Sequence, residues 1–437
     1  MIVDSVIVGR GVGVEALAAV GASDWVNWMM LWTMQGIALG FSVHIAQAFG
    51  ARDYAGIRKA AAMLVLLCVV LGVVLTVVGQ LMIEPLLRLL RTEELIYGGA
   101  RLYLRVLFFG NIPVLAYNTA AGVLRCLGDS RSPLISIAVA AVINISLDLL
   151  FVMVFHWGIF GAALATVLAQ TCALLYCLLV MRRIPELQIR KEDWRVQLNL
   201  LQKLCRLGLP LGVQYGTITI GGMVVQFALN RIGFVYVAAF AAVNKLIGIM
   251  ECTAIAFGSA MTAYMGQNGG ARRIDRIDSG IRAVRFLSLV FSSAIGGGMI
   301  LFGRGLLGWF VSTEELHAAE VIEVAYQYLF VLSFALPSLF LLHAYRSSVQ
   351  GLGNIKVSAI TGAIEIAMRA GLAVTLPRFF GPTGIFFSEF AAWSGAGLFS
   401  VVYYYCNIGP IKRRLTANAE SLKIDTKTVC AEYEKEG

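Results

Sequence analysis

Charged side chains are scarce in this sequence. They make up 14% of its 437 residues, whereas a soluble domain averages about 25%. Hydrophobic residues reach 59%, and no soluble fold could bury that much apolar surface. The composition therefore excludes a soluble protein and leaves membrane proteins as the class to consider.

The residue types that build metal centres and covalent active sites are also few. The chain has four scattered histidines, and its eight cysteines form no CxxC pair and no metal-ligand spacing with His. We interpret the cysteines as small packing residues, and we expect no metal site and no cofactor. A GxxxxGK[ST] phosphate loop is missing, and no set of nucleophile, acid and base converges. We therefore expect neither nucleotide hydrolysis nor an enzyme, and we assign no catalytic residue.

Long apolar runs, in contrast, are abundant. About 20 apolar residues cross a hydrocarbon core of about 30 Å as a helix, whereas the strands of a membrane barrel would show alternating segments of about ten residues. The runs are continuous, so the sequence predicts an all-α polytopic membrane protein. We place eleven full spans at residues 16–49, 58–82, 94–124, 132–155, 158–181, 203–230, 236–267, 280–303, 318–345, 357–377 and 382–408.

The chain contains an internal repeat. The stretch "SVHIAQAFGARDYAGIRKA" matches "TAYMGQNGGARRIDRIDSGIRA" when 220 is added to its numbering, and a second block at an offset of 225 relates residues 103–109 to 328–334. Duplicated halves are frequent in secondary transporters. The repeat predicts an N-terminal lobe at 1–183, a cytoplasmic linker at 184–200, a C-terminal lobe at 201–410 and a polar cytoplasmic tail at 411–437.

The repeat also predicts a shortened first helix. The second half opens at about Lys203, so the first half is expected to begin about 18 residues before Met1. Residues 1–10 are too short to span the membrane and are interpreted as half of a helix. We expect a start further upstream; the alternative is a helix that is short in the working protein. With this helix restored, the chain has two homologous six-helix lobes, or twelve helices, related by an axis along the membrane normal.

The distribution of positive charge predicts the orientation. The net charge is +9, and most of the 35 Lys and Arg lie in segments that are inside if the N-terminus is cytoplasmic. This bias follows the positive-inside rule. We therefore expect both termini in the cytoplasm, insertion in the bilayer of the cytoplasmic (inner) membrane, and no nucleic-acid binding.

Five stretches together resemble the multidrug and toxic compound extrusion (MATE) transporters. The likeness runs from residue 3 to about 408, and two features depart from the family pattern: the missing start of helix one, and "GLGNIK" in place of a second "GDSRSP". The resemblance implies a twelve-helix antiporter that exports organic, often cationic compounds in exchange for inward H⁺ or Na⁺, through a cleft between its lobes. The stretches are "VDSVIVGRGVGVEALAAVG", "GDSRSPL", "NISLDLLFV", "GIFGAALATVLAQ" and "GQNGGARR".

Ionisable residues within spans are the candidate coupling residues. The resemblance implies that Asp4 takes part in ion coupling inside the first helix; the alternative is an acid solvated at a frayed helix end. Asn144 and Asp148 lie four residues apart and hence on one helix face. They either join Asp4 in a cation site or make helix–helix hydrogen bonds. Glu365 and Arg369 have the same spacing, and we expect a self-neutralising structural pair.

A second set of residues predicts a substrate cavity. Asp24, Trp28 and Gln35 share a narrow arc of the second helix, and Asn244 and Glu251 lie on the matching arc of the eighth. Two stripes with acids suit a cationic guest, and the neighbouring Trp and Met residues offer an adaptable surface. The alternative for these neighbours is an aromatic belt and core packing. They are Trp25, Met29, Met30, Trp32 and Met34.

The sequence as a whole favours an H⁺- or Na⁺-coupled antiporter, expected to be a monomer, for small organic cationic or amphipathic compounds. Its nearest rival is a flippase for a lipid-linked precursor, which predicts a cavity lined by Arg and Lys that holds pyrophosphate. The candidate cavity residues Asp4, Asp24 and Glu251 are acidic, which favours the antiporter. A receptor or assembly scaffold remains a third alternative.

Overall fold

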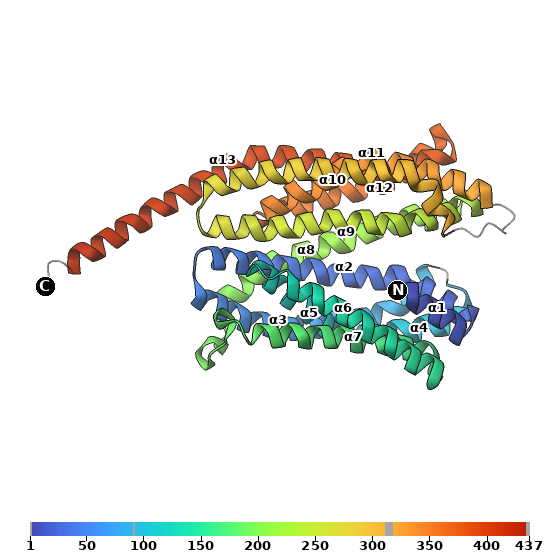
Figure 1. Cartoon of the computed structure of the whole chain (residues 1–437), viewed down its shortest axis with the longest axis horizontal. Helices are drawn as coiled ribbons and strands as arrows, with labels where there is room; N and C mark the ends of the chain where they lie inside the picture. The colour runs from blue at the N-terminus through green and yellow to red at the C-terminus, as the bar shows by residue number, and fades with distance from the viewer. Residues whose placement is uncertain (1, 91, 311–317, 434–437) are drawn as a thin grey trace. The chain divides into compact units, whose positions relative to one another are not determined.

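The computed structural model describes residues 2–90, 92–310 and 318–433, and in these ranges the chain is helical throughout, with no strand (Figure 1). The first part of the chain forms seven α-helices and one π-helical segment. They are α1 (Ile2–Gly11), α2 (Val14–Gly50), α3 (Tyr54–Leu89), α4 (Glu94–Phe109), α5 (Asn111–Cys126), α6 (Arg131–Asp148), the π-helix η1 (Leu149–Val154) and α7 (Gly158–Met181).

The rest of the chain begins with two short 3₁₀ segments and continues with long helices. The first two segments occupy the stretch expected to link the lobes. In order they are η2 (Pro185–Leu187), η3 (Lys191–Trp194), α8 (Leu198–Asn230), α9 (Phe234–Gly270), α10 (Ile274–Gly308), α11 (Ala318–Gly351), α12 (Lys356–Phe380), the 3₁₀ segment η4 (Pro382–Ile385) and α13 (Phe386–Tyr433).

Nine helices of the described ranges are long and apolar enough to cross a membrane, or ten if one bent pair counts as a span. The bent pair corrects the expectation of a single helix at 94–124: α4 and α5 meet at Gly110 with a bend of 50°. Pro113, in the first turn of α5, lacks the N–H that a continuous helix would pair with the carbonyl of Phe109.

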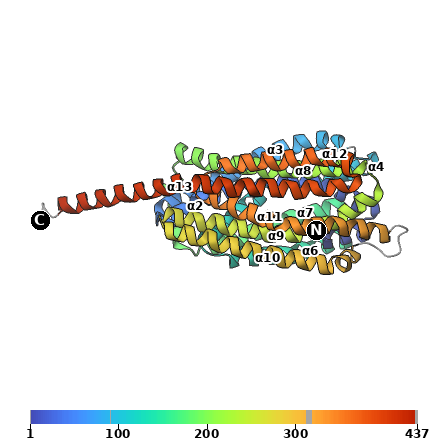
Figure 2. The ribbon, with the colours of Figure 1, turned by 90° about the horizontal axis from the view of Figure 1, so that it is seen from above.

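The helix α8, expected as a full span, is not among these nine. It forms over 33 residues, but Gln214, Thr217, Thr219 and Gln226 interrupt its apolar run and lower its mean hydropathy. At the other end of the chain, α13 extends the predicted last span into the segment expected to be a polar tail. Figures 1 and 2 show its C-terminal part continuing beyond the neighbouring α10 and α11.

Two compact units make up the chain. One comprises Met1–Ile45 and Asp53–Ile220, and the other comprises Ala46–Arg52 and Gly221–Gly437. Because this division passes through α2 and α8, the lobe boundaries expected from the repeat stay a prediction. We refer to the two as the N-terminal and C-terminal units.

Glycines allow close helix packing inside the N-terminal unit. A Cβ at Gly36 would lie 2.5 Å from the carbonyl oxygen of Leu211, so the backbones of α2 and α8 almost touch there. Close approach through small residues is the usual way in which helices associate in lipid.

The linker is also held to this unit, because the buried Asp193 of η3 lies 3.4 Å from the guanidinium Nε of Arg58 on α3.

The helix α11 is the centre of the C-terminal unit and packs against α9, α10 and α13. Its last turns, from Leu342 to Gly351, are almost entirely buried. Arg346 lies among them at 1% exposure. The helix continues beyond the expected end of the span at 345, and Arg346 lies within it.

The backbone repeats the pattern seen in the sequence. Arg52 and Arg272, which correspond at the offset of 220, have φ of 59° and 58°, although positive φ is uncommon for residues other than glycine. Asp53 follows Arg52 and caps α3 by accepting a hydrogen bond from the backbone N–H of Gly56 at 2.8 Å. Three pairs of glycines with positive φ also correspond between the halves. They are Gly13 and Gly233, Gly128 and Gly353, and Gly158 and Gly381, with Arg52 and Arg272 as the non-glycine pair.

Candidate ion and substrate sites

Three acids of the N-terminal unit gather around one tyrosine. The hydroxyl of Tyr103 on α4 lies in the electrostatic field of Asp24 on α2, Asp4 on α1 and Asp148 at the end of α6. The sequence placed Asp24 in a substrate cavity and the other two in a coupling site, whereas the structure brings all three into one neighbourhood. Tyr103 was not among the candidates, because nothing in its local sequence distinguishes it from a packing tyrosine.

An apolar cluster lies next to Tyr103. It consists of buried side chains from α1, α2, η1 and α7, and Tyr103 packs against it. Because apolar side chains exclude water, charge interactions next to them are stronger than in solvent. The cluster contains Ile7, Val8, Ala16, Val20, Val152 and Ala162.

Asp148 is the most unusual of the three acids. It is 0% exposed, and neither of its carboxylate oxygens has a hydrogen-bond partner within the described part of the chain. The charge of Asp4 acts on it. It is followed directly by the π-helix η1, a rare geometry that is frequent at functional sites. A buried carboxylate without a partner is costly, so this acid needs either a proton or a bound cation.

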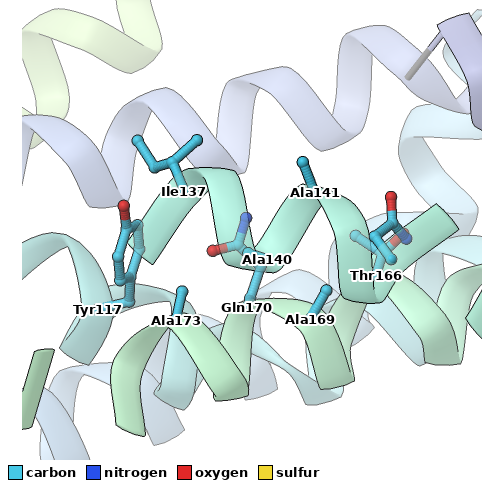
Figure 3. A pocket seen from close by; sticks show the side chains of 9 residues that line it. Tyr117, Ile137, Ala140, Ala141, Thr166, Ala169, Gln170 and Ala173 are labelled. Carbon is cyan, nitrogen blue, oxygen red and sulfur yellow. The ribbon is translucent and has the colours of Figure 1, made fainter. Parts of the chain in front are cut away.

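A cavity of about 170 Å³ lies between α5, α6 and α7, close to Asp148 in the sequence of α6. Asn144, one helical turn before Asp148, lines it, and the amide Nδ2 of Asn144 has no hydrogen-bond partner in the described ranges. The volume accommodates several waters. Figure 3 shows the side chains of Tyr117, Thr166 and Gln170 around this cavity.

Thr166 and Gln170 were missed by the sequence analysis, although a pattern for them exists. They lie four residues apart in α7 and therefore on one helix face, which is the spacing that drew attention to Asn144 and Asp148. Thr166 and Gln170 line the same cavity as Asn144. Within the described ranges, no three His, Cys, Asp or Glu side chains are placed to hold a metal ion.

The other candidates on α2 divide into two groups. Trp28 and Gln35 are partly buried, and the ring of Trp28 meets that of Trp25 edge-on with centroids 5.5 Å apart. Met30 and Met34 are 8% and 1% exposed. These two methionines are therefore core residues of the N-terminal unit, as the packing alternative predicted.

The acids of the C-terminal unit form a cluster of their own. Glu251 on α9 is partly buried and lies in the field of Glu389, Arg369 and Glu365. Asn244, the other predicted cavity residue of α9, is also partly buried.

The expectation of a self-neutralising pair on α12 needs a correction. Glu365 accepts a hydrogen bond from Arg346 on α11, with Oε1 and Nη1 2.7 Å apart. The guanidinium Nη2 of Arg369 lies 2.9 Å from Oε1 of Glu389 on α13. Each of the two residues of α12 therefore pairs with a residue of a neighbouring helix and not with the other. The neighbouring helices α11 and α13 each carry a side chain of the opposite charge at this face of α12. All four residues are 9% exposed or less.

Comparison with known proteins identifies the family. The family model MatE matches residues 1–150 and 210–375. The chain is 34% identical to "Probable multidrug resistance protein YpnP" of Bacillus subtilis (strain 168) over 63% of this chain and 62% of that protein, slightly less than two thirds of its length. It is 30% identical to "Probable multidrug resistance protein YoeA" of the same organism over 72% of this chain and 70% of that protein.

Solved structures share the fold. A MOP superfamily transporter from Pyrococcus furiosus Vc1 (DSM3638) superposes with a TM-score of 0.87 at 23% identity, covering 94% of this chain and 92% of that one. A multidrug resistance MATE family transporter in an outward-facing conformation gives 0.85 at 22% identity, with the same two coverages of 94% and 92%. The chain is a multi-pass membrane protein and a transporter rather than an enzyme, and it belongs to the MATE family of multidrug transporters.

Proposed function

We propose that this protein is an antiporter that exports small organic compounds, cationic or amphipathic, in exchange for H⁺ or Na⁺ by alternating access. The coupling residues are Asp4, Asp148 and Asn144. The observation that carries the proposal is Asp148, which is fully buried without a hydrogen-bond partner in the described chain and lies in the field of Asp4. Relatives named as multidrug resistance proteins support the substrate class.

Coupling requires a group whose binding of a proton or Na⁺ differs between the two conformations of the transporter. An ion shifts the balance between two conformations only through its different affinity for them. Asp148 and Asp4 can each bind a proton or help to bind a cation, so the occupancy of this pair sets the net charge of the region. Asn144 adds amide groups, with its oxygen as a neutral acceptor for a proton carrier or for Na⁺. A change in water access to this region would then exchange the ion.

The substrate cavity is proposed from the stripes of Asp24, Trp28 and Gln35 on α2 and of Asn244 and Glu251 on α9. The acids attract a cationic guest, and the indole of Trp28 offers a π-face to it. Because Asp24 shares the neighbourhood of Tyr103 with Asp4 and Asp148, a cationic guest and the coupling ion would compete for the same negative field.

The rival flippase is less well supported. Holding a pyrophosphate requires Arg or Lys side chains that point into the cavity. The cavity that Asn144 lines has no Arg or Lys in its wall, and within the described residues Arg346 and Arg369 are already paired with carboxylates. We also propose that both termini are cytoplasmic and that the working protein is a monomer.

Transport into inverted membrane vesicles tests this function. We expect a fluorescent organic cation to accumulate when an outward-directed ion gradient is imposed, with H⁺ and Na⁺ gradients applied in separate experiments. Vesicles without the protein are the control. Accumulation that is driven only by ATP, or uptake restricted to an anionic lipid diphosphate, would contradict the proposal.

A further inference from the structure

Two guanidinium groups share one carboxylate where α3 packs against α4. Nη2 of Arg101 lies 2.7 Å from Oε1 of Glu84, and Nη2 of Arg105 lies 3.5 Å from the same oxygen. We call these three residues the α3–α4 arginine cluster. Because both arginines are ionised at every physiological pH, the single carboxylate leaves the cluster with an excess of positive charge.

Hydrogen bonds between the two helices hold the cluster in place. The side-chain amide Nε2 of Gln80 on α3 donates to the backbone carbonyl of Arg105 at 2.8 Å. The hydroxyl of Thr76, one turn earlier on α3, donates to the carbonyl of Phe108 at 3.0 Å. These bonds fix the position of α4 along α3, so the packing of the helices places both arginines beside Glu84.

The cluster lies inside a membrane-spanning segment. Arg105 is eleven residues beyond Glu94, the first residue of α4, which corresponds to about 16 Å along a helix. The bent pair of α4 and α5, from Glu94 to Cys126, has the length and hydropathy of one span and is longer than a hydrocarbon core of about 30 Å requires. Its first turns therefore extend beyond the core, and Arg105 lies a short way inside it, within reach of the lipid headgroups.

The surface around the cluster is apolar. On α3, the exposed Leu81 lies three residues before Glu84 and thus on the same face. On α4, the exposed Leu102 and Phe109 lie on one face with Arg105. Exposed apolar faces on membrane-spanning helices contact lipid chains, so the arginine cluster opens to the lipid.

The internal repeat shows that the scaffold does not require an arginine at this position. Arg105 corresponds to Phe330 at the offset of 225. Phe330 is 41% exposed on α11, close to the 45% of the Arg105 side chain. Phenylalanine suits contact with lipid chains, whereas a charged side chain that faces hydrocarbon is costly unless it is neutralised or reaches the interface. Glu84 can neutralise only one of the two arginines, so Arg105 still requires an anion.

The corresponding contact of the C-terminal unit has balanced charges. Glu84 corresponds to Arg304 at the offset of 220, and Arg101 corresponds to Tyr326 at 225. The guanidinium carbon of Arg304 lies 4.6 Å from the ring centroid of Tyr326, and its Nη2 lies 3.0 Å from Oε2 of Glu323. There, one guanidinium meets one carboxylate and one ring. The excess of positive charge therefore distinguishes the α3–α4 contact from its counterpart between α10 and α11.

We propose that the α3–α4 arginine cluster binds the phosphate group of an anionic phospholipid. The fork of N–H donors on a guanidinium matches the oxygens of a phosphate. Arg105 is the main contact, because its separation of 3.5 Å from Glu84 is long for a charge-assisted hydrogen bond, and Arg101 is the second. The acyl chains of the lipid lie along Leu102 and Phe109. A free phosphate ion fits less well, because it has no apolar part to cover these side chains and would lose its hydration.

The inference goes beyond the proposed function, which assigns the coupling ion and the substrate to residues of α1, α2, α6 and α9. A lipid bound at the cluster would neutralise Arg105 and stabilise the contact between α3 and α4. It would do so whichever ion the protein exchanges.

Native mass spectrometry of the purified full chain in a neutral detergent tests the site. Phosphatidylglycerol, or phosphatidylcholine with the same acyl chains, is titrated onto the wild-type protein, Arg105→Phe and Arg304→Gln, and the number and affinity of the retained lipids are compared. Arg105→Phe introduces the residue found at the corresponding position of the C-terminal unit. Arg304→Gln removes an exposed arginine that is paired with Glu323, so it is the matched control for net charge.

We expect Arg105→Phe to retain one phosphatidylglycerol fewer than the other two proteins. Affinity at this site should weaken by at least about tenfold, as for the loss of one hydrogen bond to a charged group. Retention of phosphatidylcholine should be the same in all three proteins.

Three results would overturn the inference. Equal retention of phosphatidylglycerol by Arg105→Phe and the wild type would mean that the lipid binds elsewhere. An equal loss in Arg304→Gln would mean that retention depends only on net charge. Displacement of the lipid by inorganic phosphate would mean that the site takes a soluble anion. If Arg105→Phe does not fold, Arg105→Gln takes its place with the same expected loss. The measurement involves no transport, so it can fail while the proposed antiport stands, and the reverse.

Discussion

We expect Asp148→Asn to reduce gradient-driven export to the rate of vesicles that lack the protein. Asparagine keeps the size of the side chain but cannot bind a proton, and it carries no charge for Na⁺. Because the carboxylate of Asp148 is fully buried and has no hydrogen-bond partner in the described residues, its replacement removes no known contact. The folded protein should therefore be retained at a normal level, and uptake of a fluorescent cation under an imposed ion gradient measures the defect.

Two further variants make this result specific. Asp4→Asn should share the loss if the two acids form one site, since the charge of Asp4 acts directly on Asp148. Ser146→Ala, on an exposed position of the same helix, removes only a hydroxyl that donates to the backbone of Val142 and should export normally. Wild-type export by Asp148→Asn would mean that the coupling ion binds elsewhere.

The second large effect concerns stability. Replacing Arg346 by Met should lower the free energy of unfolding by about 3–5 kcal/mol, because it leaves the carboxylate of Glu365 buried without its partner. Arg346 and Glu365 are 1% and 3% exposed, and their atoms lie 2.7 Å apart. The double variant Arg346→Met/Glu365→Met should be much closer to wild type, since it removes both charges. Thermal unfolding in detergent, followed by loss of the monodisperse peak, measures both.

A surface ion pair provides the control for this prediction. Arg304 and Glu323 lie 3.0 Å apart, but their side chains are 63% and 51% exposed. Arg304→Met should therefore change stability by no more than about 1 kcal/mol. Equal destabilisation by Arg304→Met and Arg346→Met would show that burial of the Arg346–Glu365 pair does not increase the loss in free energy of unfolding when one partner is removed.

Much of the architecture could be predicted from apolar runs and the repeat. The length of a run determines whether a helix spans, so most helices lie where expected. The break at Gly110 could not be read in this way, because both α4 and α5 are apolar enough to pass as one helix. The helical continuation of α13 beyond 408 was also missed, because hydropathy marks the end of a span and not the end of a helix.

The candidate sites were only partly predictable, for a related reason. Spacing within one helix identifies residues that share a face, as with Asn144 and Asp148, but it says nothing about which helix lies opposite. The partners of Glu365 and Arg369 are on α11 and α13, and Tyr103 is on α4. Contacts between residues of different helices can be identified only from the three-dimensional packing of the helices.

The most direct test of the central claim measures ion movement driven by substrate. In proteoliposomes without an imposed ion gradient, a gradient of the organic cation should drive H⁺ or Na⁺ in the opposite direction through the wild-type protein. A pH-sensitive dye or radioactive Na⁺ reports the movement. The account predicts that Asp148→Asn binds the cation but moves no ion. Ion movement at the wild-type rate through Asp148→Asn would contradict the assignment of the coupling ion to this carboxylate.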